Sequence, residues 1–268
     1  LHIIGLEERK EGSKFIIDRK SIEKRSEGSL IENAINILNT EDPLRKIPDL
    51  SVFGSTREER LFNIALELSI TWINRILFLK LLEGQLQNYH GKSKDYFFLD
   101  PEKISGYDEL SKLFHQVLAV KAQERTPVIM EKYKYVPYLN SSLFDVSALE
   151  DLTIRINSLD PTSTLDLPST TVLKEVKKKT SELPALTYLF RFLNAFDFSS
   201  EGGEEIQEDE SRTLINASVL GKVFEKINGY KDGSVYTPGF VTMYMCKQSI
   251  RATVLQKFKE KHSWNVET

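Results

Sequence analysis

The chain has 268 residues, of which 40% are hydrophobic and 28% are charged, as in a water-soluble globular protein of one or two domains. Its net charge of -3 gives no global sign of nucleic-acid binding, and its single cysteine, Cys246, excludes an intramolecular disulfide and a cysteine zinc cluster. No apolar run of about 18 residues is present, so no membrane span is expected and a cytoplasmic location is the default.

The first predicted element is a β-hairpin within residues 1–20. Apolar segments flank the turn sequence Glu-Gly-Ser at 11–13, as expected of two paired strands. Residues 28–39 then predict an amphipathic helix. Its apolar side would carry Leu30, Ile31, Ala34, Ile35 and Leu38. We therefore expect an N-terminal extended segment over residues 1–25 and a helical domain over residues 26–198.

The longest predicted helix runs from about Arg57 to Tyr89. Ser55 is a candidate N-cap, because Glu58 follows it at the spacing of a capping box. Apolar residues cover most of the circumference of this helix, which predicts the buried centre of a helical bundle. They are Leu61, Ile64, Ala65, Leu68, Trp72, Ile76, Leu79 and Leu82. A narrow polar stripe consists of Arg60, Asn63, Glu67, Thr71 and Asn74.

Two shorter helices are predicted next, over residues 108–121 and 127–135. His115 lies on the first of them and is expected at the surface or at an interface. Residues 136–145 then predict a loop, in which turn-forming Asn140 and its neighbouring serines are anchored by apolar side chains.

A second, small β component is predicted within residues 152–173. Its two extended segments would be 153–156 and 164–167, where β-branched and apolar residues gather between prolines. A basic, solvated connection over 174–180 follows, and then an aromatic-rich helix over 183–198. The predicted fold class is mainly α, a multi-helix bundle with a small β component.

The clearest predicted loop covers residues 199–212, which combine two glycines with a run of acidic residues. This charge would repel a phosphate backbone, so the loop is expected to face away from bound DNA. A helix over 214–227 is predicted next. We assign residues 213–268 to a helical lead-in toward a further domain, since the first and last residues suggest a piece of a longer polypeptide.

The most informative motif lies at residues 233–240, after the block Leu-Gly-Lys-Val-Phe-Glu at 220–225. Thr237 is a good N-cap and Pro238 suits the first position of a helix over about 240–258. A helix N-terminus offers free N–H groups and a partial positive charge, so it suits a carboxylate or a phosphate. Taken alone, Thr237 and Pro238 are explained by an ordinary capped helix.

These blocks resemble the lead-in to the catalytic domain of the gamma-type adenine DNA methyltransferases of restriction–modification systems, and type IIG enzymes in particular. Two further blocks support the resemblance. The Phe-Leu-Lys sequence at 78–80 is similar to a helix ahead of that domain, and the Tyr-Leu-Asn-Ser-Ser-Leu-Phe sequence at 138–144 is similar to a loop that often carries two glycines. The resemblance implies that Tyr236, Thr237 and Pro238 contact the cofactor S-adenosyl-L-methionine.

The resemblance implies a fragment of an adenine-specific DNA methyltransferase that supports DNA and cofactor binding. The expected partners are double-stranded DNA and the downstream methyltransferase and target-recognition domains. The Asn-Pro-Pro-Tyr-type loop that acts on a flipped adenine is absent from the chain, so no catalytic residue is assigned and the fragment alone is expected to be inactive. The alternative interpretation is a non-enzymatic helical interaction or scaffold module.

A stand-alone nuclease is a second alternative. Its metal site would combine Glu7 or Glu8 with the Asp-Arg-Lys sequence at 18–20, although such short motifs are frequent by chance. The four histidines are scattered and lack the spacing of a zinc site, so no metal site is assigned. The last helix is basic and could contact DNA phosphates, or could simply be solvated. Its cations are Lys247, Arg251, Lys257, Lys259 and Lys261.

Overall fold

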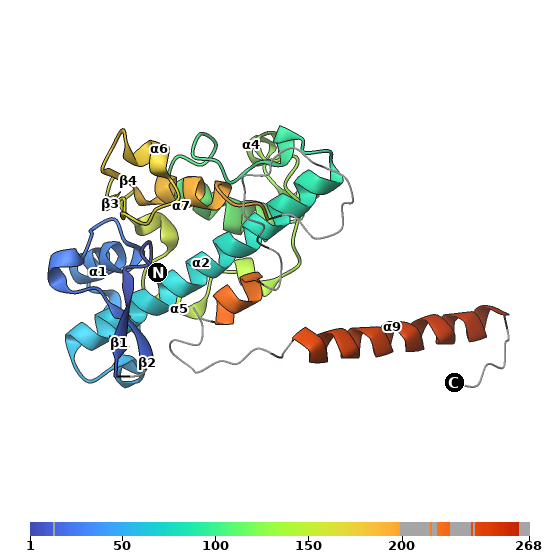
Figure 1. Cartoon of the computed structure of the whole chain (residues 1–268), viewed down its shortest axis with the longest axis horizontal. Helices are drawn as coiled ribbons and strands as arrows, with labels where there is room; N and C mark the ends of the chain where they lie inside the picture. The colour runs from blue at the N-terminus through green and yellow to red at the C-terminus, as the bar shows by residue number, and fades with distance from the viewer. Residues whose placement is uncertain (13, 199–214, 216–218, 226–236, 238, 263–268) are drawn as a thin grey trace. The chain divides into compact units, whose positions relative to one another are not determined.

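The computed structural model describes residues 1–12, 14–198, 215, 219–225, 237 and 239–262. The chain forms two compact units, Leu1–Asn216 and Ala217–Thr268. The described residues are mainly α-helical and contain two antiparallel sheets of two strands each (Figure 1). This confirms the predicted fold class. No helix among the described residues is long and apolar enough to cross a membrane.

The first unit begins with the predicted hairpin, in which β1 (Leu6–Glu11) pairs with β2 (Lys14–Arg19). The turn includes Gly12 with φ +61°, a conformation that glycine adopts without strain. The N-terminal residues before β1 also support the next helix, α1 (Leu30–Glu41). The carbonyl oxygens of Ile3 and Ile4 accept the N–H groups of Leu30 and Ile31, which lack partners within the helix.

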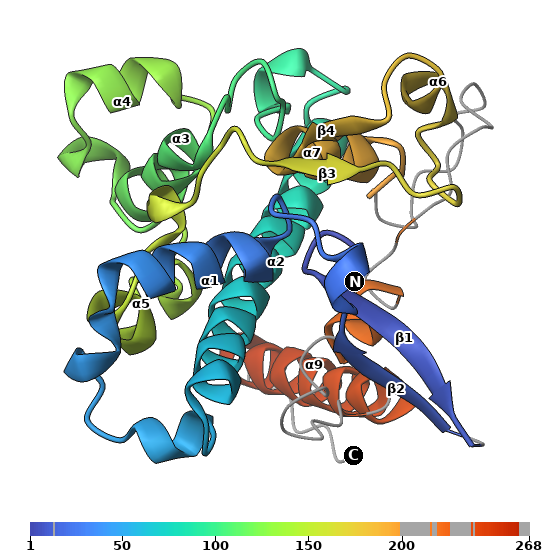
Figure 2. The same cartoon turned by 90° about the vertical axis from the view of Figure 1, so that its left-hand side faces the viewer.

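The longest helix, α2 (Arg57–Tyr89), has the predicted bounds and runs through the middle of the first unit, with α1 packed across it (Figure 2). Its buried face includes the fully buried Trp72 and Leu79. The predicted N-cap is wrong by one residue. The hydroxyl of Thr56 accepts the N–H of Glu59 at 3.2 Å, and the Glu59 carboxylate accepts the N–H of Thr56 in return, so Thr56 and Glu59 form the capping box in place of Ser55 and Glu58.

Short helical turns connect the longer elements. The 3₁₀ turns are η1 (Ile22–Lys24), η2 (Pro43–Lys46), η3 (Leu50–Phe53), η4 (Lys94–Tyr96), η6 (Ala122–Glu124), η7 (Ser142–Phe144) and η8 (Ile156–Ser158).

The predicted helix over 108–121 consists of two parts, α3 (Tyr107–Lys112) and the π-helical η5 (Leu113–Leu118). The wider π turn buries Phe114, Val117 and Leu118 completely. The helix predicted over 127–135 is the shorter α4 (Pro127–Lys132).

The extended segment predicted at 153–156 is wrong. α5 (Ala148–Leu152) ends just before it, and η8 begins at its last residue, Ile156. Ile154 and Ile156 are both buried, although their spacing is that of one face of a strand. No described strand pairs with this segment, and Ile156 is buried where η8 packs against α3.

The second extended segment is confirmed as β3 (Thr164–Asp166), which pairs with β4 (Glu182–Pro184). Between them lies the one-turn helix α6 (Lys174–Lys177), within the predicted basic connection. The aromatic-rich helix is α7 (Ala185–Asn194). A small core joins the sheet to α7 and contains Leu165, Leu167, Ala185 and Tyr188.

In the second unit, residues 219–225 are helical, within the helix predicted over 214–227. The last helix, α9 (Gly239–His262), extends the prediction over 240–258 at its carboxyl end. The acidic segment predicted as a loop over 199–212 lies outside the described residues.

Candidate functional site

The segment expected to contact the cofactor lies at the start of α9. Thr237 is exposed and α9 begins at Gly239. Tyr236 and Pro238 lie outside the described residues, so the interaction of this segment with S-adenosylmethionine stays a prediction.

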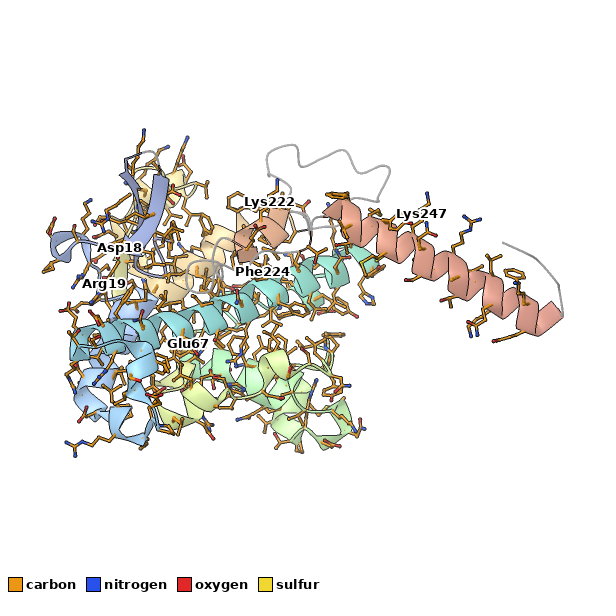
Figure 3. The ribbon with its side chains drawn as sticks, turned by 90° about the horizontal axis from the view of Figure 1, so that it is seen from below. Asp18, Arg19, Glu67, Lys222, Phe224 and Lys247 are labelled. Carbon is orange, nitrogen blue, oxygen red and sulfur yellow. The ribbon has the colours of Figure 1, made fainter. Side chains whose placement is uncertain are left out.

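The basic residues predicted on the last helix are all exposed. Lys247, labelled in Figure 3, lies in its first half, and the other cations lie in its second half: Arg251, Lys257, Lys259 and Lys261. Apolar side chains of α9, including Phe240 and Met243, are exposed as well. The helix therefore has cations available for a phosphate backbone, but they alternate with apolar groups.

Two of the acidic residues considered for a nuclease, Glu7 and Asp18, form ion pairs. Glu7 pairs with Lys24 at 3.2 Å, and Asp18 pairs with Arg9 across the hairpin. Lys20 is buried, and its Nζ lies 2.6 Å from Nδ1 of His2. Among the described residues, no group of three or more His, Cys, Asp or Glu side chains could hold a metal ion. The structure thus gives no support to the nuclease alternative.

A concave site that the sequence analysis missed lies between the hairpin, α1 and the start of α2. We call it the arginine pocket, and its volume is about 400 Å³. Three guanidinium groups line it, from Arg19 at the end of β2, Arg25 after η1 and Arg57 at the start of α2. The remaining lining residues are Ile35, Asn39, Glu58 and Leu61. Figure 3 labels Arg19 and its neighbour Asp18.

Hydrogen bonds fix the arginines of this pocket. Arg19 donates from Nε and one terminal nitrogen to both carboxylate oxygens of Glu32, at 2.8 and 2.7 Å. Arg25 donates from Nε to the carbonyl oxygen of Lys20 at 2.9 Å. Arg57 pairs with Asp42 at 3.1 Å. The pocket therefore presents oriented guanidinium groups, which bind phosphate and carboxylate well.

Nothing in the sequence marks this pocket as a motif. Arg19, Arg25 and Arg57 belong to different elements, and only the packing of the hairpin and α1 beside α2 brings them together. The charge pattern of each segment alone is that of an ordinary solvated surface.

The Tyr-Leu-Asn-Ser-Ser-Leu-Phe block at 138–144 has a clear structural role. Arg75 of α2 donates to the carbonyl oxygens of Leu143 and Asp145, both at 2.7 Å, and so holds the end of the block. The same guanidinium forms a two-pronged pair with Glu150, at 2.7 and 2.8 Å. Trp72 donates its indole N–H to Glu150 at 2.8 Å. This network ties the block and α5 to the central helix.

The electrostatics of Glu150 follow from this arrangement. Burial alone would raise the pKa of its carboxyl group. The hydrogen bonds from Arg75 and from the N–H of Ser147, together with the positive charge of Arg75, outweigh that effect and lower the pKa to about 2. Glu150 is therefore charged at neutral pH and paired inside the protein.

The Phe-Leu-Lys sequence at 78–80 ends in a second buried cation. Lys80 pairs with Glu83 one turn later and donates to Oδ1 of Asn194 at 2.7 Å. Glu83 also accepts the N–H groups of Phe98 and Leu99, at 2.8 and 2.6 Å. Lys80 and Glu83 thus fasten α7 and the 98–99 segment to α2, and neither is open to a ligand.

His115, which was predicted at the surface or at an interface, is half-buried. Its Nδ1 lies 2.8 Å from the carbonyl oxygen of Phe144, at the end of the same block. Burial lowers the pKa of its imidazole. The hydrogen bond to Phe144 raises this pKa, and the positive charge of Arg75 lowers it further, so that the pKa stays below its ordinary value. His115 therefore supports the block as a neutral side chain.

Comparison with known proteins gives one curated relative. A protein of Methanocaldococcus jannaschii that is named as a type II restriction enzyme and methyltransferase is 27% identical over 208 residues. The alignment covers 72% of this chain but only 15% of the relative, so the chain spans a small part of that protein's length. No solved structure matches the chain. A family model described as Domain of unknown function (DUF7814) matches residues 1–215, and the chain belongs to this family.

Proposed function

We propose that this chain is the helical segment that precedes the catalytic domain of an adenine-specific, S-adenosylmethionine-dependent DNA methyltransferase in a restriction–modification system. The observation that carries the proposal is the similarity to the Methanocaldococcus jannaschii protein, which extends over 72% of the chain. The sequence blocks at 78–80, 138–144 and 220–240 support it independently.

In this proposal the chain helps to bind and position the cofactor and the DNA. The downstream catalytic domain performs the methyl transfer. Tyr236, Thr237 and Pro238 would form one wall of the cofactor site, where N–H groups at the start of α9 would face the methionine carboxylate. The cations of α9 would add salt-dependent attraction for the DNA backbone. The buried networks of Arg75 and Lys80 would keep the helical domain rigid.

The experiment uses the full-length parent protein with Thr237→Ala and Thr237→Ser. The parent should transfer labelled methyl groups from S-adenosylmethionine to adenine in duplex DNA. Thr237→Ala should lose about 1 kcal/mol of stability with the N-cap and should also bind the cofactor more weakly in calorimetry. Thr237→Ser keeps the hydroxyl and should preserve both properties.

Two results would separate the proposal from its alternatives. Unchanged cofactor affinity in a destabilised Thr237→Ala protein would leave Thr237 as an ordinary cap. A parent protein that transfers no methyl group to DNA would favour a helical interaction module.

A further inference from the structure

The arginine pocket has the composition of an anion site. Its three guanidinium groups come from separate segments and converge on one cavity of about 400 Å³. Arg19 and Arg25 are largely withdrawn from solvent, with 12% and 26% of their side chains exposed. Groups held in this way lose little freedom when they bind a ligand.

Several N–H groups in the pocket are available to a ligand. Glu32 occupies Nε and one terminal nitrogen of Arg19, and the other terminal nitrogen lies 3.8 Å from Glu58, beyond hydrogen-bond distance. Within the described part of the chain, the terminal nitrogens of Arg25 form no hydrogen bond, because its one bond uses Nε. Arg57 donates to Asp42 at 3.1 Å and to Oδ1 of Asn39 at 3.5 Å, and because its side chain is 56% exposed, both bonds are readily rearranged.

The carboxylates around the pocket have different roles. Glu32 is mostly buried and orients Arg19. Glu58 is 80% exposed, in the first turn of α2, and can move into solvent when an anion approaches Arg19. Glu58 thus competes weakly with a bound anion for Arg19, while Glu32 holds Arg19 in a fixed orientation.

We propose that the arginine pocket binds a phosphate group. Guanidinium groups match phosphate oxygens with paired hydrogen bonds, and three of them can surround one phosphate. The cavity is larger than a bare phosphate, so it leaves room for a group attached to the phosphate beside Ile35 and Leu61. The ligand is therefore a nucleic-acid backbone phosphate or a free nucleotide. This inference stands on the pocket itself and does not depend on the proposed function.

The test measures binding of two probes to the 268-residue chain, a fluorescent duplex DNA and fluorescent adenosine triphosphate. Arg25→Ala and Arg57→Ala should each weaken binding about tenfold, because each variant loses one charge-assisted hydrogen-bond partner of the phosphate. Arg191→Ala, on the exposed face of α7 outside the pocket, removes the same charge and should leave affinity unchanged. Thermal melts confirm that each variant is folded.

A fourth variant distinguishes loss of a ligand contact from loss of binding through misfolding. Glu58→Gln removes the competing carboxylate and should tighten binding about threefold, a gain that a damaged fold would not produce. If the duplex is the ligand, each lost arginine should also reduce the slope of log affinity against log salt by about 0.9.

The two probes separate the sources of the phosphate. Binding of the duplex alone identifies a backbone phosphate, and binding of the nucleotide alone identifies a small ligand. The proposal is overturned if neither probe binds, if Arg191→Ala weakens binding as much as the pocket variants, or if Glu58→Gln leaves affinity unchanged.

Discussion

Arg75 and Glu150 are almost completely withdrawn from water, with 1% and 0% of their side chains exposed. Burying such a pair costs desolvation free energy, and this cost is offset only when the polar atoms of both side chains are hydrogen-bonded. Here Arg75 donates to both carboxylate oxygens and to two carbonyl oxygens, and Trp72 and Ser147 donate to the same carboxylate. The network therefore compensates the burial of both charges.

Removing one charge of this pair should be far more costly than removing an exposed one. Glu150→Gln leaves the Arg75 charge buried without its counter-ion and should lower the free energy of unfolding by about 3–5 kcal/mol. Asp151→Asn, next in the sequence, breaks only the exposed pair with Arg155 and should cost about 0–1 kcal/mol. Urea denaturation of both variants measures the difference, and similar small losses would contradict a buried network.

The same variant should reveal a pH dependence. Because the pKa of Glu150 falls from 4.5 to about 2 on folding, its contribution to stability is complete above pH 4.5. It is lost as the pH falls from 4.5 toward 2. The stability difference between the wild type and Glu150→Gln should therefore narrow over that interval, and a constant difference would show that Glu150 keeps its ordinary pKa.

At the scale of elements, the start of α2 distinguishes two overlapping capping boxes. Ser55 with Glu58 and Thr56 with Glu59 have the same spacing, and only the second pair makes the hydrogen bonds. Thr56→Ala should therefore destabilise the protein by about 1 kcal/mol, because a side-chain acceptor of the first turn is lost. Ser55→Ala should stay within about 0.5 kcal/mol of the wild type. Denaturant midpoints test this, and the reverse order would restore the predicted N-cap.

Elements differ in how far their sequences predict them. The bounds of α2 were predictable because 33 residues repeat one helical pattern. The cap register was not, because both boxes satisfy the same local rule. α5 and η8 were missed because they are short and depend on burial of Ile154 and Ile156 against other parts of the fold.

The two candidate sites also differ in how far the sequence predicts them. The segment at 236–238 could be proposed from the sequence because Thr237 and Pro238 carry the local signature of a helix start, and its role stays a prediction. The arginine pocket could not be found, since Arg19, Arg25 and Arg57 converge only through the packing of the hairpin and α1 beside α2. Sequence spacing holds no information about such a convergence.

At the scale of the whole molecule, folding and catalysis should be separable. The first unit has its own core, centred on α2 and including Trp72, Phe114 and Phe144. The same 268 residues contain no Asn-Pro-Pro-Tyr-type sequence to hold a flipped adenine. We therefore expect the chain to support binding of DNA or cofactor without acting on the base.

The isolated chain should therefore unfold cooperatively yet transfer no methyl group. The assay incubates it with labelled S-adenosylmethionine and an adenine-containing duplex, beside the full-length parent and a sample without protein. A cooperative thermal melt of the same preparation shows that missing activity does not reflect a missing fold. Transfer above the sample without protein would mean that these 268 residues carry a catalytic site of their own, and the division between a supporting helical domain and a separate catalytic domain would then be wrong.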